Sequence, residues 1–184
     1  PPMATASHVS KVPNNQTSHV SPIKFRFDVS MAQRLGIELQ PKELTDDELA
    51  WTRNAIAAYK DFREVVQFGD QYRLISPYDE SRAALMYVDA QQSRAVLFAY
   101  VFGFHYRENY PQIRLKGLDP DKNYRLKEIM PAMSYNKKTG KKRVNQAFAA
   151  EGEIFGGAFL MEYGIRLKLR KTYESAVFEI TEVK

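Results

Sequence analysis

The stretch Arg94-Ala95-Val96-Leu97-Phe98-Ala99-Tyr100-Val101-Phe102-Gly103-Phe104 decides the fold of this chain. Alternate side chains of a strand point to opposite faces of a sheet, and both sets are apolar from Ala95 to Phe102. Such a strand is normally central and covered on both sides. We therefore predict that it packs in a β-rich core or at a domain interface. An alternative is that its aromatic face is exposed and stacks on sugar rings. That face comprises Phe98, Tyr100, Phe102, Phe104 and Tyr106.

A two-residue period extends over the rest of the chain from residue 71 onward. Short apolar-polar segments alternate there with Gly, Pro, Asp and Asn, as in the turn signal Gly117–Asn123. This pattern predicts a mainly β fold class with a C-terminal antiparallel β-sandwich of about eight strands. The predicted strands are Tyr72–Ile75, Ala83–Val88, Arg94–Phe104, Gln112–Lys116, Tyr124–Ile129, Phe159–Met161, Gly164–Leu169 and Ser175–Glu182. The pair Gly156-Gly157 between strands predicts a bend or bulge.

Residues 1–68 lack this two-residue period: residues 1–27 show little periodicity, and a later segment has apolar side chains at helical spacing. Residues 1–27 predict a short strand followed by a structured loop. Asp28 is suited to cap a short helix through Leu35, with Gly36 ending it. Thr45 and Glu48 form a capping box that predicts a longer helix to about Val66. The apolar stripe of this longer helix comprises Ala55, Ile56, Tyr59, Phe62 and Val66.

The net charge of +5 and the pI of about 9.3 raise nucleic acid as a partner class. The basic side chains, however, alternate with apolar ones along the predicted strands, as they do over Ile165–Arg170, which is typical of a solvated sheet face. The dense cluster Lys137–Arg143 contains Gly140 and indicates a solvated loop tip. No run approaches the ~20 apolar residues that a membrane span needs. We therefore predict neither a nucleic-acid nor a membrane partner.

The sequence contains no recognisable catalytic motif. His8, His19 and His105 lack metal-ligand spacing such as HExxH, and there is no cysteine, so we expect no metal and no cofactor. No GxSxG motif occurs. The polar stretch His8–Thr17 starts only seven residues from a first residue that is proline, with no room before it for a supporting fold. We therefore expect the C-terminal portion of a longer protein whose chemistry lies partly or wholly upstream.

His8-Val9-Ser10, followed by Val12-Pro13-Asn14 and Gln16-Thr17, is the first of several motifs that occur in the order of one known family. The others are Arg34-Leu35-Gly36-Ile37-Glu38-Leu39, Gly69-Asp70-Gln71-Tyr72-Arg73-Leu74, Ser76-Pro77-Tyr78, Ala84-Leu85-Met86-Tyr87-Val88 and Leu115-Lys116-Gly117-Leu118-Asp119-Pro120. Together they resemble the α-galactosidases of glycoside hydrolase family 36 over nearly the whole chain. Several motifs in one register are much more specific than any one of them alone.

The resemblance implies a retaining glycosidase that removes terminal α-linked galactose from oligosaccharides such as melibiose or raffinose. Both catalytic aspartates of the family lie on earlier strands, so it implies no catalytic residue in this chain. Residues 1–68 would supply the last strand, loop and helices of a (β/α)8 catalytic barrel, and residues 71–184 the C-terminal β-sandwich domain. The loop after the last strand would place His8, Ser10 and Asn14 near the sugar pocket. The alternative, which we favour, is that these three polar side chains only hold the loop together.

The implied partners are the upstream barrel, α-galactoside sugars for the full enzyme, and further copies in a homo-oligomer. The chain alone is expected to be inactive. A rival from another class stays open, namely a standalone, non-catalytic carbohydrate-binding or structural β-sandwich module with a helical linker.

Overall fold

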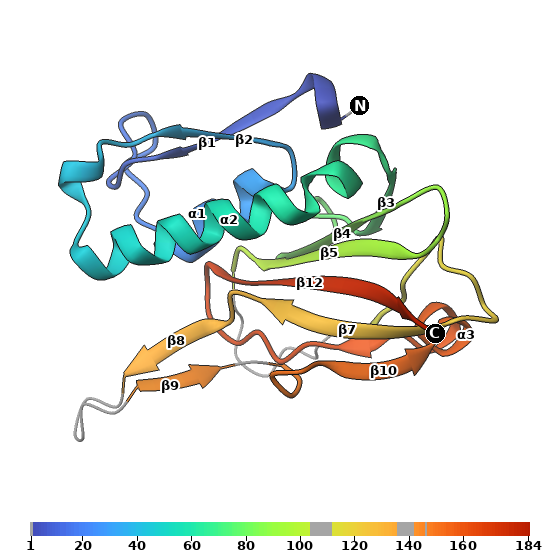
Figure 1. Cartoon of the computed structure of the whole chain (residues 1–184). Coiled ribbons are helices and arrows are strands. Elements are labelled where there is room, and N and C mark those ends of the chain that lie inside the picture. The colour runs from blue at the N-terminus through green and yellow to red at the C-terminus, as the bar shows by residue number, and fades with distance from the viewer. Residues whose placement is uncertain (1, 104–111, 136–141, 146) are drawn as a thin grey trace.

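The computed structural model describes residues 2–103, 112–135, 142–145 and 147–184 (Figure 1). Its elements are η1 (Pro2–Ala4), β1 (Ala6–Ser10), α1 (Ile23–Met31), β2 (Arg34–Glu38), η2 (Pro41–Glu43), α2 (Asp46–Phe68), β3 (Asp70–Ile75), β4 (Arg82–Val88), β5 (Arg94–Val101), β6 (Gln112–Ile113), β7 (Asn123–Ile129), β8 (Ala132–Tyr135), β9 (Lys142–Asn145), β10 (Glu153–Gly156), α3 (Gly157–Glu162), β11 (Ile165–Arg166) and β12 (Glu174–Val183). The mainly β fold class is confirmed. No helix in these ranges is long and apolar enough to cross a membrane.

A six-stranded antiparallel sheet forms the centre of the fold, with the strand order β10-β7-β12-β5-β4-β3. β5 pairs with β12 on one side and β4 on the other, so the predicted central position of this strand is confirmed. β12 is the last strand of the sheet in sequence, yet it lies between β5 and β7. Helices α1 and α2 lie between this sheet and the β1–β2 pair (Figure 1).

The two faces of β5 belong to different apolar clusters. Val96, Phe98 and Tyr100 face α1 and α2, whereas Ala95, Leu97 and Ala99 face the opposite side. Leu115, Leu118, Leu160, Ile165 and Leu167 cover that opposite side. Core packing is thus confirmed for Phe98 and Tyr100, which are buried. Phe102 is 38% exposed, and Phe104 and Tyr106 lie outside the described residues.

Helix α2 begins at the predicted capping box. The Glu48 backbone N–H donates to Thr45 Oγ1 at 3.3 Å, and Glu48 Oε2 accepts from the Thr45 backbone N–H at 3.0 Å. The helix runs to Phe68, and its predicted stripe packs on the sheet: Ala55, Tyr59, Phe62 and Val66 are buried. This helix therefore follows from its local sequence and from the apolar face that it covers.

β1 and β2 pair in parallel, and α1 connects them. The strand predicted before residue 27 is confirmed as β1. The predicted helix from Asp28 to Leu35 is wrong: α1 begins at Ile23 after Pro22, and Gly36 lies in the middle of β2. Asp28 is buried within the helix, because its side chain bonds to other buried groups and caps nothing.

Those buried groups join α1 to the sheet. Asp28 Oδ2 accepts hydrogen bonds from Lys24 Nζ at 2.6 Å and Ser175 Oγ at 2.7 Å. The Tyr100 hydroxyl donates to the Asp28 backbone carbonyl at 2.9 Å. Burial raises the pKa of Asp28, and the Lys24 ammonium opposes that shift. Asp28 Oδ1 has no hydrogen-bond partner among the described residues. The network therefore ties α1 to β12 and β5 through a buried carboxylate.

The layer on the far face of the sheet differs from the prediction in detail. Gln112–Lys116 and Gly164–Leu169 shorten to the mutually paired β6 and β11. The predicted strand Phe159–Met161 is wrong, because this segment belongs to α3. Only Leu160 of the three is buried, as expected for a short surface helix, and Gly156 is its N-cap. β8, β9 and β10 were not predicted, and residues 137–141 of the basic cluster lie outside the described ranges.

Candidate functional site

A cavity of about 600 Å³ opens at the end of the β1–β2 pair. Because parallel strands end at the same edge, the loops that follow β1 and β2 meet there. The three side chains singled out from the sequence, His8, Ser10 and Asn14, all line this cavity. The remaining lining residues are Ala6, Ser7, Lys11, Asn15, Gln16, Glu38, Gln40 and Glu43.

His8 is placed by a glycine on the neighbouring strand. Gly36 is its partner in the parallel register, and a Cβ atom added at Gly36 would lie 1.9 Å from Cδ2 of His8. The imidazole therefore lies against the backbone of Gly36, where no side chain is present. Its Nδ1 is 3.5 Å from Glu38 Oε1. Both side chains are about half exposed, at 47% for His8 and 63% for Glu38. Their pairing adds little stability in water. It does hold the His8 imidazole and the Glu38 carboxylate side by side in the cavity.

Asn14 organises the loop that follows β1. Its Oδ1 accepts from the backbone N–H groups of Gln16 and Thr17, both at 3.0 Å, and its Nδ2 donates to Ser10 Oγ at 3.2 Å. Arg26 of α1 donates to the Ser10 carbonyl, which ties the loop to the helix. Asn14 therefore shapes the cavity wall, and its polar atoms are largely engaged within the loop.

Two family models match this chain: one described as Glycosyl hydrolase family 36 C-terminal domain over residues 82–180, and one described as Melibiase over residues 1–69. The chain belongs to glycoside hydrolase family 36. It corresponds to the C-terminal portion of a family 36 α-galactosidase.

Two named relatives of this family 36 chain are much longer proteins. It is 42% identical to "Alpha-galactosidase AgaA" of Geobacillus stearothermophilus over 131 residues, which cover 70% of this chain and 18% of that protein. It is 31% identical to "Bifunctional alpha-galactosidase/sucrose kinase AgaSK" of Mediterraneibacter gnavus, and the match covers 100% of this chain and 17% of that protein. A crystal structure of AgaA in complex with stachyose matches with a TM-score of 0.82 and 32% identity. The match covers 100% of this chain and 22% of the AgaA chain. The chain thus spans about a fifth of the length of its relatives.

Sequence reasoning missed the contribution of β2 and η2 to the cavity of the family 36 chain. Glu38, Gln40 and Glu43 line it, but Gly36 was interpreted as the end of a helix. The signal that could have corrected this is the segment Arg34–Leu39, in which apolar residues alternate across a glycine. Interpreting this segment as a strand would have placed Gly36 within the strand and Glu38 at its end, but its pairing with β1 depends on the tertiary fold.

We predict that Gly36→Ala lowers the free energy of unfolding of the family 36 chain by about 1–3 kcal/mol, because the methyl group overlaps the His8 ring. The ring must move, so the His8 imidazole resonances should shift in ¹H–¹³C NMR spectra. The matched control is Gly103→Ala, whose Cβ would meet Ser81 at an ordinary 3.7 Å. Equal urea-unfolding curves for both variants would contradict this account of Gly36.

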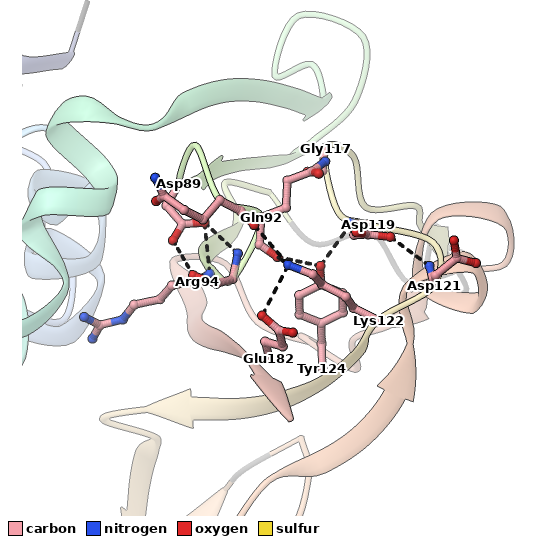
Figure 2. Close-up of polar contacts among 11 residues, drawn as sticks. Asp89, Gln92, Arg94, Gly117, Asp119, Asp121, Lys122, Tyr124 and Glu182 are labelled. Atoms are coloured by element: carbon pink, nitrogen blue, oxygen red, sulfur yellow. Dashed lines mark hydrogen bonds and ion pairs between the residues drawn. The ribbon is translucent and has the colours of Figure 1, made fainter. Parts of the chain in front are cut away.

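A second concentration of polar groups lies where the turn between β4 and β5 meets the turn before β7, as Figure 2 shows. The Tyr124 hydroxyl donates to the Gln92 carbonyl at 2.7 Å, Gln92 Nε2 donates to the Gly117 carbonyl at 2.9 Å, and Lys122 Nζ is 3.2 Å from Glu182. These groups bond to one another and join the two turns.

Nowhere in the described part of the family 36 chain do three His, Asp or Glu side chains gather to hold a metal ion.

Proposed function

We propose that this chain is the C-terminal part of a retaining α-galactosidase, and that its role is to complete and support the catalytic barrel. The observation that carries the proposal is the parallel β1–α1–β2 unit with a polar cavity at its carboxyl edge. Units of this kind build (β/α)8 barrels, whose active sites lie at that edge. A complete barrel takes about 250 residues, so most of it precedes this chain.

We divide the chain into residues 1–68, which end the barrel, and residues 71–184, which form the C-terminal β-domain. Retention requires two carboxyl groups about 5–5.5 Å apart, one of them an acid held in its protonated form. Glu38 and Glu43 are the acidic residues of the cavity, whereas the family resemblance implies two aspartates on earlier barrel strands. We therefore place both catalytic carboxylates upstream, and expect this chain alone to be inactive.

The substrate we propose is a terminal α-linked galactose of an oligosaccharide such as melibiose or raffinose. His8 and Ser10 would face the sugar, and Asn14 would hold their loop. Gly36→Ala tests this in the full enzyme: a displaced His8 should lower kcat/KM for an α-galactoside about tenfold, the effect of one lost hydrogen bond to substrate. An unchanged kcat/KM would remove His8 from the pocket.

The decisive experiment compares the 184-residue chain with the longer protein that contains it. The longer protein should hydrolyse an aryl α-galactoside and release galactose first as the α-anomer, observed by ¹H NMR, whereas the chain alone should show no turnover. Turnover by the chain would place the acid pair within residues 1–184. A β-anomer would refute retention, and an inactive longer protein would favour the standalone β-sandwich module.

We further propose that the full enzyme is a homo-oligomer. Light scattering after gel filtration measures its molar mass and so tests this.

A further inference from the structure

A second cavity lies between the beginnings of α1 and α2 and the segment Lys171–Ser175. Its volume is about 380 Å³, within the ~300–1,000 Å³ typical of ligand pockets. It is separate from the cavity around His8, because the two have no lining residue in common. Pro22 is the one residue of the loop after β1 that lines it, and β2 contributes none.

The walls of this second cavity are aromatic. Trp51, the single tryptophan of the chain, is held at one edge by Phe27, with ring centroids 5.3 Å apart at 75°. Tyr173 packs against Phe25 at 5.3 Å and 61°. Trp51 and Tyr173 are both only partly buried, so ring surface is left for a ligand. Flat apolar rings of this kind complement the C–H face of a pyranose.

Tyr173 is held in an unusual backbone conformation. Its φ of 59° lies in the left-handed region, which bulky residues rarely adopt. A hydrogen bond from its backbone N–H to the Val101 carbonyl at 2.8 Å maintains this conformation. Strained residues of this type concentrate at binding sites, where the surrounding structure compensates for the strain. The residue held in this conformation, Tyr173, lines the cavity.

Polar groups surround the aromatic walls. Lys24 and Ser175 line the cavity and are held by the buried carboxylate of Asp28. Asp47, at the first turn of α2, is exposed and also lines the cavity, as does Glu48. Carboxylates accept hydrogen bonds from hydroxyl groups, and an ammonium donates to them. The combination of ring surface with acceptors and a donor fits a neutral sugar better than an anion or an aliphatic chain.

A third, smaller cavity of about 220 Å³ shares lining residues with both of the others. It shares Ser10, Lys11 and Asn14 with the cavity around His8, and Phe25 and Tyr173 with the cavity around Trp51. The three cavities therefore follow one another from His8 to Trp51. An oligosaccharide whose terminal galactose lay at the first could reach the last with a more distant sugar unit.

We propose that the Trp51–Tyr173 cavity is a second carbohydrate-binding site, which takes an outer pyranose unit of an oligosaccharide. This inference rests on the proposed function for the identity of the sugar chain, but not on catalysis by this chain. It also accounts for the strained Tyr173 and for the partly exposed position of Trp51.

The test is a titration of the 184-residue chain with stachyose, followed by tryptophan fluorescence. Because Trp51 is the single tryptophan, the signal reports on this cavity alone. The wild-type chain should show a saturable change at millimolar sugar. Tyr173→Ala and the surface variant Asp47→Asn should each weaken binding about threefold to tenfold, as expected for one lost ring contact or hydrogen bond. Tyr163→Ala, on an exposed tyrosine of α3 outside the cavity, is the matched control and should bind like the wild type.

A kinetic measurement on the longer enzyme keeps the inference testable if the isolated chain folds poorly. There, Tyr173→Ala should raise KM for stachyose threefold to tenfold and leave KM for an aryl α-galactoside unchanged. A flat fluorescence response in the wild-type chain with a native circular dichroism spectrum, or equal changes of both KM values, would overturn the proposal. Sugar binding at Trp51 without turnover by the longer protein would instead overturn only the proposed function.

Discussion

Asp28→Ala should lower the free energy of unfolding by about 3–5 kcal/mol, the cost of removing one partner of a buried ion pair. The Asp28 side chain is fully buried and is the hydrogen-bond partner of both Lys24 and Ser175. Its loss leaves the Lys24 ammonium, which is only 11% exposed, without its counter-charge. Urea unfolding followed by circular dichroism measures the change. Glu64→Ala, at an exposed position of α2, is the control and should stay within about 0.5 kcal/mol of wild type.

The isosteric variant Asp28→Asn separates the charge from the packing. Burial raises the pKa of Asp28 above its ordinary 3.8, so the native state binds this proton more tightly than the unfolded state. The resulting stabilisation is present below about pH 3.8 and is lost as the pH rises through the raised pKa. The stability of the wild type minus that of Asp28→Asn should therefore fall with increasing pH. Burial also raises the pKa of Glu128. Because Glu128 is present in both the wild type and Asp28→Asn, its contribution cancels in the difference. A difference that grew with pH would contradict this description of Asp28.

Phe98→Ala should lower the free energy of unfolding by about 3–5 kcal/mol, the usual cost of deleting a buried aromatic ring. Phe98 is 0% exposed on the helix-facing side of β5 and contacts the rings of Phe62 and Tyr87 edge-on, with centroids 6.2 and 6.1 Å away. The void would open between α2 and the centre of the sheet, where neighbouring strands and the helix prevent collapse.

Two further variants serve as a graded comparison and a control for Phe98→Ala. Phe98→Leu keeps most of the volume and should cost less than the alanine variant, because a smaller void remains. Tyr78→Ala removes a ring that is 97% exposed, and should change stability by no more than about 0.5 kcal/mol. If Phe98→Ala unfolded at the same urea concentration as Tyr78→Ala, the position of β5 in the core would be wrong.

The parts of the fold that the sequence predicts correctly are those specified by neighbouring residues. The capping box of Thr45 and Glu48 begins a helix regardless of what surrounds it. The Ala95–Phe102 stretch can satisfy its two apolar faces only in the middle of a covered sheet. Both features appear in the structure, where the strand ends at Val101 and Phe102 is partly exposed.

The errors occur where a distant contact decides the conformation. Asp28 resembles a helix cap locally, but Lys24 and Ser175 make it a buried partner instead. Gly36 resembles a helix end, but it is required in a strand because the His8 ring lies across it. Neither partner can be identified from the residues next to Asp28 or Gly36.

The same distinction applies to the candidate site. His8, Ser10 and Asn14 lie within one short segment, and the structure brings them to one cavity. Glu38 and Glu43 reach that cavity only through the parallel pairing of β1 with β2. The cavity around Trp51 combines residues from four separate parts of the chain, so its composition depends on the tertiary fold.

The position of β12 has a consequence for synthesis of the chain. During translation β5 and β7 leave the ribosome long before residues 174–183, the strand that bonds to both of them. Until then each exposes an unpaired edge, which invites pairing with other nascent chains. We therefore expect ribosome-bound intermediates to be the species most dependent on chaperones, and the sheet to close in a single late step.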